Sequence, residues 1–164
     1  MTALFDPLRV LRTLLAHEVR FVVVGGFAGA LWGSPSITVD LDICYERSSR
    51  NYEALVAALR DLGATLRGAP DGLPFQLDAQ SIKMGDSFTF KTTAGDFDCL
   101  GTPSGTNGYR DLRTNATTFE LAPDLRVDVC SLDDLIRMKR AAARRKDLIE
   151  VEILTAVKEE REKT

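Results

Sequence analysis

Residues 37–45 read Ile-Thr-Val-Asp-Leu-Asp-Ile-Cys-Tyr, and this stretch decides the fold. Apolar and polar side chains alternate along it, which predicts a β-strand with one face in the core. Asp40 and Asp42 then share the second face of the strand, about 7 Å apart. The apolar residues between and around them are expected to point into the core: Val39, Leu41 and Ile43.

Two carboxylates on one strand face repel each other, and a divalent cation beside them relieves that repulsion. Magnesium prefers hard oxygen ligands, which one or two carboxylates and the phosphates of a substrate supply. Asp40 and Asp42 are therefore candidate magnesium ligands. The alternative is a polar strand face that contacts only water.

The segment before this strand adds a candidate phosphate site. Residues 20–24 (RFVVV) predict a buried strand that ends at Gly25-Gly26, and residues 27–33 predict a short helix. Glycines there let a phosphate approach backbone N–H groups closely, and a helix N-terminus favours negative charge. The spacing matches neither a P-loop nor a dinucleotide-binding fingerprint.

The remaining pattern predicts further helices and strands around this pair of segments. Asp6-Pro7 begins a helix, and Ser48 or Ser49 caps a second one that ends at Gly63. Residues 67–86 are rich in Gly, Pro and Asp, which indicates a loop with room for one short strand. The other expected elements are strands at 87–93, 96–100 and 125–130, and helices at 131–143 and at 147–163, the last of these capped by Asp147.

This order predicts a mixed α/β (α+β) fold, with a small mixed β-sheet flanked by helices and further helices at the C-terminus. A length of 164 residues suits one domain, 1–164. Within it we expect a sheet-containing core at 1–130 and C-terminal helices at 131–164.

Composition narrows the class of protein. A hydrophobic content of 45% with 27% charged residues is typical of a globular domain, and we find neither a membrane-spanning run nor a signal peptide. Three cysteines without paired spacing indicate a reduced, cytoplasmic setting. His17 is the only histidine, which argues against a zinc site and against a Ser–His or Cys–His nucleophile. A net charge of −3 means that any contact with nucleic acid must use a local patch.

Two blocks of sequence resemble a known family. Gly25-Gly26 followed by Asp40-Leu41-Asp42 resembles the signature of the polymerase-β-like nucleotidyltransferases. Residues 131–140 (SLDDLIRMKR) with residues 145–148 (RKDL) resemble the Lys…Arg-x-Lys-Asp region of AbiEii-type proteins, a group that includes the MenT toxins. The resemblance spans about residues 20–155. It departs from the pattern at Gly26, where many members have a serine whose hydroxyl contacts phosphate; here only backbone N–H groups could do so.

The resemblance implies roles for further residues. Asp98 is the expected third carboxylate, a metal ligand or general base, with Asp96 and Asp128 as alternatives. Lys139 matches the family lysine that meets the triphosphate and stabilises charge on the departing pyrophosphate. Asp147 is expected to cap a helix or orient Lys139. The remaining cations of the basic run could contact an RNA backbone, although a solvated helix face also explains several of them: Arg140, Arg144, Arg145 and Lys146.

The resemblance also implies a function. An enzyme of this kind uses magnesium and an NTP, transfers NMP to the 3′ end of tRNA, releases pyrophosphate and blocks translation as the toxin of a toxin–antitoxin pair. A cognate antitoxin protein would be its partner. Two alternatives stay open: transfer of NMP to a protein or small-molecule hydroxyl, and a non-catalytic domain that binds nucleotide or a partner.

Overall fold

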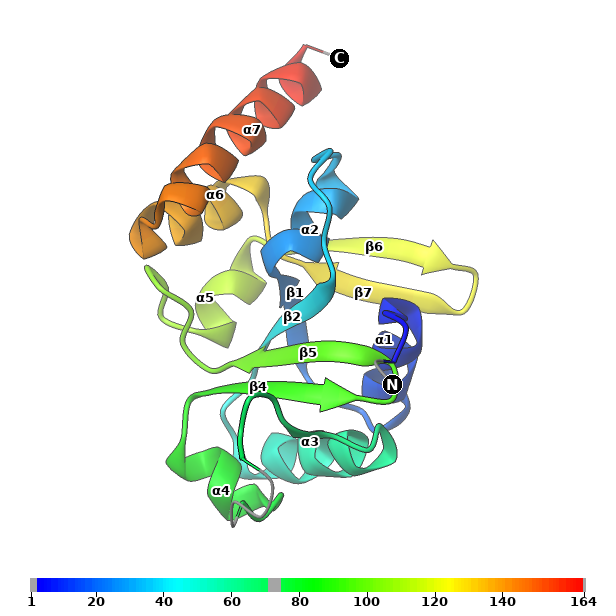
Figure 1. Ribbon diagram of the computed structural model, residues 1–164. Helices are drawn as coiled ribbons and strands as arrows, with labels where there is room; N and C mark the ends of the chain where they lie inside the picture. Colours follow the sequence, from blue (N-terminus) through cyan, green and yellow to red (C-terminus); the bar gives the residue numbers. More distant parts are fainter. Residues whose placement is uncertain (1–2, 71–74, 164) are drawn as a thin grey trace.

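The computed structural model describes residues 3–70 and 75–163, so residues 71–74 of the expected loop at 67–86 lie outside the described part. A mixed sheet runs through the molecule, with helices packed around it and a long C-terminal helix that projects from one end (Figure 1). The helices are α1 (Pro7–Ala16), α2 (Gly25–Trp32), α3 (Ser49–Asp61), α4 (Ala79–Met84), α5 (Tyr109–Thr114), α6 (Leu132–Ala142) and α7 (Arg145–Glu162). The strands are β1 (Phe21–Val24), β2 (Asp40–Tyr45), β3 (Thr65–Leu66), β4 (Ser87–Thr92), β5 (Gly95–Leu100), β6 (Thr117–Ala122) and β7 (Leu125–Val129).

The described strands form one 7-stranded sheet in the order β3-β4-β5-β2-β1-β7-β6. Strand β2 is central, because it pairs antiparallel with β1 and parallel with β5. The hairpin expected at residues 87–100 is confirmed as β4 and β5, which pair antiparallel. The predicted mixed α/β class is confirmed.

Each of the strands β2, β4 and β5 has one apolar and one polar face. Residues that pair across neighbouring strands point to the same side of the sheet. Leu41 pairs with Phe97, and Phe97 pairs with Phe90; all three side chains are fully buried in the core. On the opposite face Asp42 pairs with Asp98. The alternation read from the sequence therefore separates the core from the polar face.

The strand that carries Asp40 and Asp42 is shorter than the sequence predicts. It begins at Asp40 rather than at Ile37, because pairing with β5 starts at Asp40 and pairing with β1 starts at Asp42. The expectation that Val39 points into the core is wrong: its exposed fraction is 69%, and that of Ile37 is 93%. Residues before Asp40 have no neighbouring strand to pair with, so alternation alone did not bury them.

Helix caps follow the sequence closely. The side chains of Asp6, Ser48 and Ser131 accept hydrogen bonds from backbone N–H groups three residues later, at 3.2, 3.4 and 3.0 Å. The last helix starts at Arg145 rather than at Asp147, and Asp147 caps it from the third helical position, where its carboxylate accepts a hydrogen bond from the Arg144 backbone N–H. Sequence analysis missed α4, α5 and β6, which are short and lie in polar segments with weak periodicity.

Cys44, Cys99 and Cys130 are free thiols buried in the core. Within residues 3–70 and 75–163, none of the helices combines the length and apolar character needed to cross a lipid bilayer.

Candidate active site

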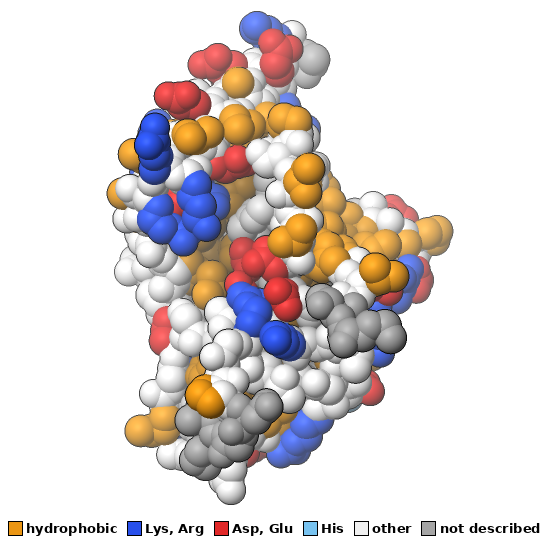
Figure 2. All heavy atoms as spheres, viewed as in Figure 1, with side chains coloured by type: hydrophobic (Ala, Val, Ile, Leu, Met, Phe, Trp, Pro, Cys, Tyr) orange, Lys and Arg blue, Asp and Glu red, His pale blue; other side chains and the backbone are white. Residues whose placement is uncertain are grey.

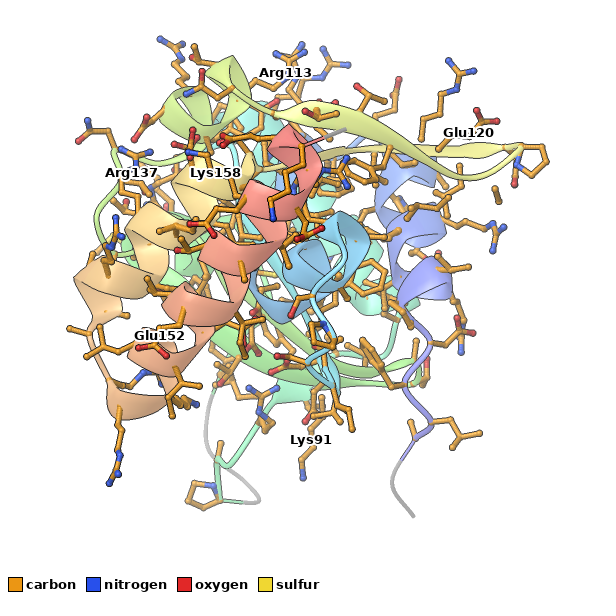
Figure 3. The ribbon with its side chains drawn as sticks, turned by 90° about the horizontal axis from the view of Figure 1, so that it is seen from above. Lys91, Arg113, Glu120, Arg137, Glu152 and Lys158 are labelled. Atoms are coloured by element: carbon orange, nitrogen blue, oxygen red, sulfur yellow. The ribbon has the colours of Figure 1, made fainter. Side chains whose placement is uncertain are left out.

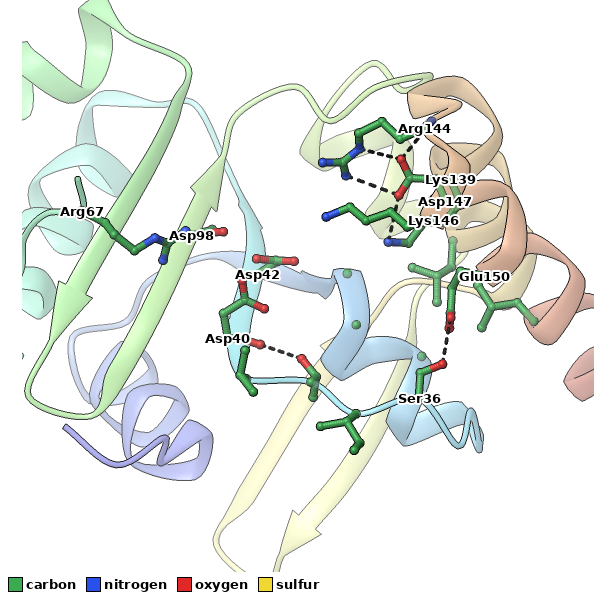
Figure 4. A pocket seen from close by; sticks show the side chains of 18 residues that line it. Ser36, Asp40, Asp42, Arg67, Asp98, Lys139, Arg144, Lys146, Asp147 and Glu150 are labelled. Carbon is green, nitrogen blue, oxygen red and sulfur yellow. Dashed lines mark hydrogen bonds and ion pairs between the residues drawn. The ribbon is translucent and has the colours of Figure 1, made fainter. Parts of the chain in front are cut away.

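Three carboxylates meet on the polar face of the sheet. Asp40 and Asp42 come from β2, and Asp98 comes from β5, where the parallel register puts it beside Asp42. One carboxylate oxygen from each of the three lies within 4.8 Å of the others. Figure 4 shows the three side chains on one wall of a pocket, directed toward its interior. An octahedral cation that binds hard oxygens fits this donor set.

Asp42 is the most strongly perturbed member of the cluster. Its Oδ1 atom is buried and has no hydrogen-bond partner among the described residues. Burial, and then the charges of Asp40 and Asp98, raise the pKa of Asp42 to about 8. A buried, unpartnered carboxylate oxygen beside two further carboxylates is costly unless a proton or a cation occupies the site. This observation supports the fit of the cluster to magnesium.

The cluster also contacts a guanidinium group that sequence analysis missed. Arg67 follows the short strand β3, and its Nη2 lies 2.8 Å from Asp98 Oδ1. Its Nη1 lies 3.6 Å from Asp96 Oδ2. Burial raises the pKa of Asp98, and the nearby Arg67 charge opposes that rise. No motif marked Arg67, because its partners are set by pairing between distant strands.

The Gly25-Gly26 turn lies directly against the carboxylates. Gly25 has a φ of +70°, a left-handed conformation that glycine adopts at low cost. A Cβ atom on Gly25 would overlap Asp42 Oδ2 and lie 2.8 Å from Asp42 Cγ. A Cβ atom on Gly26 would lie 3.1 Å from Thr38 Oγ1. These two glycines begin α2, so its N-terminal N–H groups lie beside the acidic cluster.

Basic side chains from the C-terminal segment face the carboxylates across the site. Lys139 on α6 lies 3.5 Å from Asp147, measured from Nζ to Oδ1. Asp147 is only 1% exposed and also accepts a 2.7 Å hydrogen bond from Arg144 Nε. Its carboxylate accepts from the Arg144 backbone N–H as well, so it stabilises the start of α7 from the third helical position. Asp147 therefore holds both cations against the pocket.

The carboxylate cluster forms the acidic wall and Lys139 with Arg144 forms the basic wall of one pocket of about 570 Å³. Figure 2 shows this hollow, with acidic side chains at its centre and basic side chains on either side. The residues with ionisable side chains that line it are Asp40, Asp42, Arg67, Asp98, Lys139, Arg144, Lys146, Asp147 and Glu150. Opposite the carboxylates, the Ser36 hydroxyl donates a 2.8 Å hydrogen bond to Glu150, a second contact that sequence analysis missed.

The other candidate residues lie outside this pocket. Asp96 pairs in register with Asp40 but forms its ion pair with Arg67 at the edge of the site. Asp128 accepts hydrogen bonds from Arg113 and Thr118 in another part of the molecule. Arg140, Arg144, Arg145 and Lys146 are all exposed, but only Arg144 and Lys146 line the pocket. Of the three aspartates weighed as the third carboxylate, Asp98 is the one beside Asp40 and Asp42.

No protein-family model matches the chain, and no curated protein matches it in sequence. Solved structures do match its fold. One is the lincosamide antibiotic adenylyltransferase LnuA with bound lincomycin, which has a TM-score of 0.63 and 11% identity over 95% of this chain and 99% of that chain. Another is a candidate nucleotidyltransferase from Thermotoga maritima, with a TM-score of 0.48 and 16% identity over 99% of this chain and 98% of that chain. The chain has the fold of nucleotidyltransferases.

Proposed function

We propose that this protein is a magnesium-dependent nucleotidyltransferase that transfers NMP from an NTP to the 3′ hydroxyl of tRNA. The observation that carries the proposal is one pocket in which Asp40, Asp42 and Asp98 face Lys139. Three clustered carboxylates suit a divalent cation, and a lysine across the pocket suits a phosphate chain. A non-catalytic binding domain would need no such cluster.

The residues of the pocket divide the chemistry between them. Asp40, Asp42 and Asp98 would hold magnesium, which supplies charge neutralisation at the phosphates and polarises the α-phosphorus. The N–H groups at Gly25-Gly26 would bind the phosphates, whose negative charge the start of α2 favours. The attacking hydroxyl oxygen forms a bond to the α-phosphorus. At the same time the bond between the α-phosphorus and the oxygen that bridges to the β-phosphate breaks, and pyrophosphate leaves.

Different residues are expected to accept the proton and to stabilise the developing charge. The hydroxyl proton leaves toward the carboxylates, where Asp98 is the general-base candidate. Negative charge develops on the departing pyrophosphate, and Lys139 is placed to stabilise it. Asp147 positions Lys139 without neutralising the whole basic wall, because Arg144 and Lys146 also line the pocket.

Two features support tRNA as the acceptor. Arg144 and Lys146 line the pocket together with Lys139, and Arg140 on α6 and Arg145 on α7 add exposed positive charge. Such a local patch can attract an RNA backbone although the net charge is −3. The resemblance of residues 131–148 to AbiEii and MenT proteins adds the role of a toxin whose partner is an antitoxin protein.

A small-molecule hydroxyl is the second candidate acceptor. The fold similarity to an adenylyltransferase of lincosamide antibiotics, over 95% of this chain, favours it. The two acceptors predict different labelled products.

The deciding experiment incubates the protein with each α-labelled NTP, magnesium, and either total tRNA or lincomycin. We expect label on tRNA, none on periodate-oxidised tRNA, and none with Asp42→Asn. Oxidation destroys the terminal ribose hydroxyls, so label on oxidised tRNA would contradict transfer to the 3′ end. Label on lincomycin, with none on tRNA, would replace the RNA proposal by the second candidate.

A further inference from the structure

The polar face of the sheet continues beyond the carboxylates, over β5, β4 and β3. Asp98 pairs in register with Thr89, Asp96 pairs with Lys91, and Lys91 pairs with Thr65. Paired residues share a sheet face. The side chains of Thr65, Thr89 and Lys91 therefore lie on the same side as the carboxylate cluster.

Solvent reaches this face. Thr65, Ser87, Thr89 and Lys91 are all exposed, while the alternate residues of β4, Phe90 and Thr92, are buried. Lys91 projects away from the ribbon (Figure 3) and has no ion-pair partner among the described residues. Arg67 connects this face to the pocket through its contacts with Asp96 and Asp98. We call the surface formed by the exposed residues Thr65, Ser87, Thr89 and Lys91 together with the half-buried Arg67 the strand platform.

The geometry of in-line transfer determines from which side of the pocket the acceptor hydroxyl arrives. The attacking hydroxyl and the leaving pyrophosphate occupy opposite sides of the α-phosphorus. In the proposed function the pyrophosphate leaves on the side of Gly25-Gly26 and Lys139, which line the pocket. The hydroxyl must therefore arrive from the Asp98 side, which is the side on which β4 and β3 continue the sheet.

The chemistry of the platform matches a nucleic-acid backbone. Phosphates and sugars are contacted mainly by arginine, lysine and hydroxyl side chains, and the platform presents these types, while the one carboxylate beside Lys91, that of Asp96, is paired with Arg67. A small molecule is usually enclosed by a concave pocket, whereas an open sheet face can support an extended strand. From β5 to β3 is two strand spacings, about 10 Å.

We propose that the strand platform binds the sugar–phosphate backbone of the last nucleotides of the acceptor RNA and directs its 3′ hydroxyl toward Asp98. This inference rests on the proposed function and assigns the RNA end to a surface distinct from the basic wall of α6 and α7. The wall at Arg144 and Lys146 faces the NTP phosphates and the body of the RNA. Lys91 makes the charged contact that aligns the RNA end.

The test compares Lys91→Glu, Lys91→Arg and Lys83→Glu in steady-state labelling of tRNA. Lys83 is an exposed lysine on α4 that lines neither the pocket nor the platform, so it controls for a change in net charge. We expect Lys91→Glu to raise the KM for tRNA about tenfold. The slope of log affinity for tRNA against log salt concentration should become shallower by about one, because one phosphate contact is lost. The KM for NTP should not change, and Lys91→Arg should retain most of the affinity.

The outcomes separate this inference from the proposed function. If wild-type protein labels tRNA and Lys91→Glu behaves like Lys83→Glu, the platform does not bind RNA while transfer to tRNA stands. If wild-type protein labels no RNA, the proposed acceptor is wrong and the platform inference falls with it. If Lys91→Glu raised the KM for NTP as much as the KM for tRNA, Lys91 would belong to the nucleotide site instead. Denaturation midpoints near the wild-type value would exclude misfolding as the cause, and we expect them because Lys83 and Lys91 are both exposed.

Discussion

Replacing Gly25 with alanine tests how tightly the phosphate turn and the metal cluster are joined. The residue has a φ of +70°, and its missing side chain leaves room for the Asp42 carboxylate. A Cβ atom there would overlap Oδ2 of Asp42 and lie 2.8 Å from Cγ and 2.9 Å from Cβ. Rotation of the carboxylate would not relieve the contact with Asp42 Cβ, so the backbone of β2 or α2 would have to move.

Gly25→Ala is expected to lower the free energy of unfolding for two reasons. A left-handed conformation costs a non-glycine residue roughly 1–2 kcal/mol. Overpacking in a tightly packed region adds about 1–3 kcal/mol. Gly68→Ala is the matched control, because its φ of +76° is almost the same while none of the described residues has an atom within 4 Å of the added Cβ. Gly68→Ala should therefore show only the conformational part.

The two variants are compared by urea denaturation and by magnesium-dependent transfer from labelled NTP. We expect Gly25→Ala to be less stable than Gly68→Ala by about 1–3 kcal/mol, the overpacking part alone. It should also lose transfer activity, since Asp42 would be displaced, while Gly68→Ala stays active. Equal stabilities together with full activity of Gly25→Ala would refute the close packing of turn and metal cluster.

Three further predictions concern the charged residues of the pocket. Because the pKa of Asp42 is raised from 3.8 to about 8, the folded metal-free protein holds a proton that the unfolded chain releases, so its stability should fall as pH rises through this interval. Denaturation in EDTA should show this slope, and Asp42→Asn should flatten it; a slope unchanged by the substitution would contradict the assignment. Lys139→Ala should slow transfer about a hundredfold or more through loss of a charge contact to the developing pyrophosphate, whereas Arg140→Ala should have little effect; equal losses would indicate a general basic surface. Asp147→Asn should cost about 1–3 kcal/mol in a thermal or urea melt, because its buried carboxylate binds two cations, and a wild-type melting curve would show that these ion pairs contribute little.

The central part of this fold could be predicted from the sequence because local signals and tertiary structure agree there. Alternation across Asp40 and Asp42 marks the strand, and the glycine pair marks the turn before it. Ser48 and Ser131 mark the starts of two helices through side-chain hydrogen bonds that depend only on neighbours. At Val39 the alternation continues but the sheet does not, since none of the described strands pairs there.

The basic side of the site could be predicted only in part. Lys139 and Asp147 were found through resemblance, and their ion pair depends on how α6 packs against α7. Arg67 carried no signal, because its contact with Asp98 requires β3 to pair with β4 and β4 with β5. A residue whose function depends on two successive strand registers cannot be identified from local pattern.

The distribution of charge in the pocket indicates what kind of ligand can satisfy it. Lys139 and Arg144 form ion pairs with Asp147 rather than with the carboxylates across the pocket. Asp42 keeps a buried oxygen without a hydrogen-bond partner and a pKa of about 8. A cation alone would satisfy the acidic wall, and a phosphate alone would satisfy the basic wall and repel the acidic one. A nucleoside triphosphate with its magnesium ion brings both charges in one ligand, so the two walls together favour that ligand over either ion by itself.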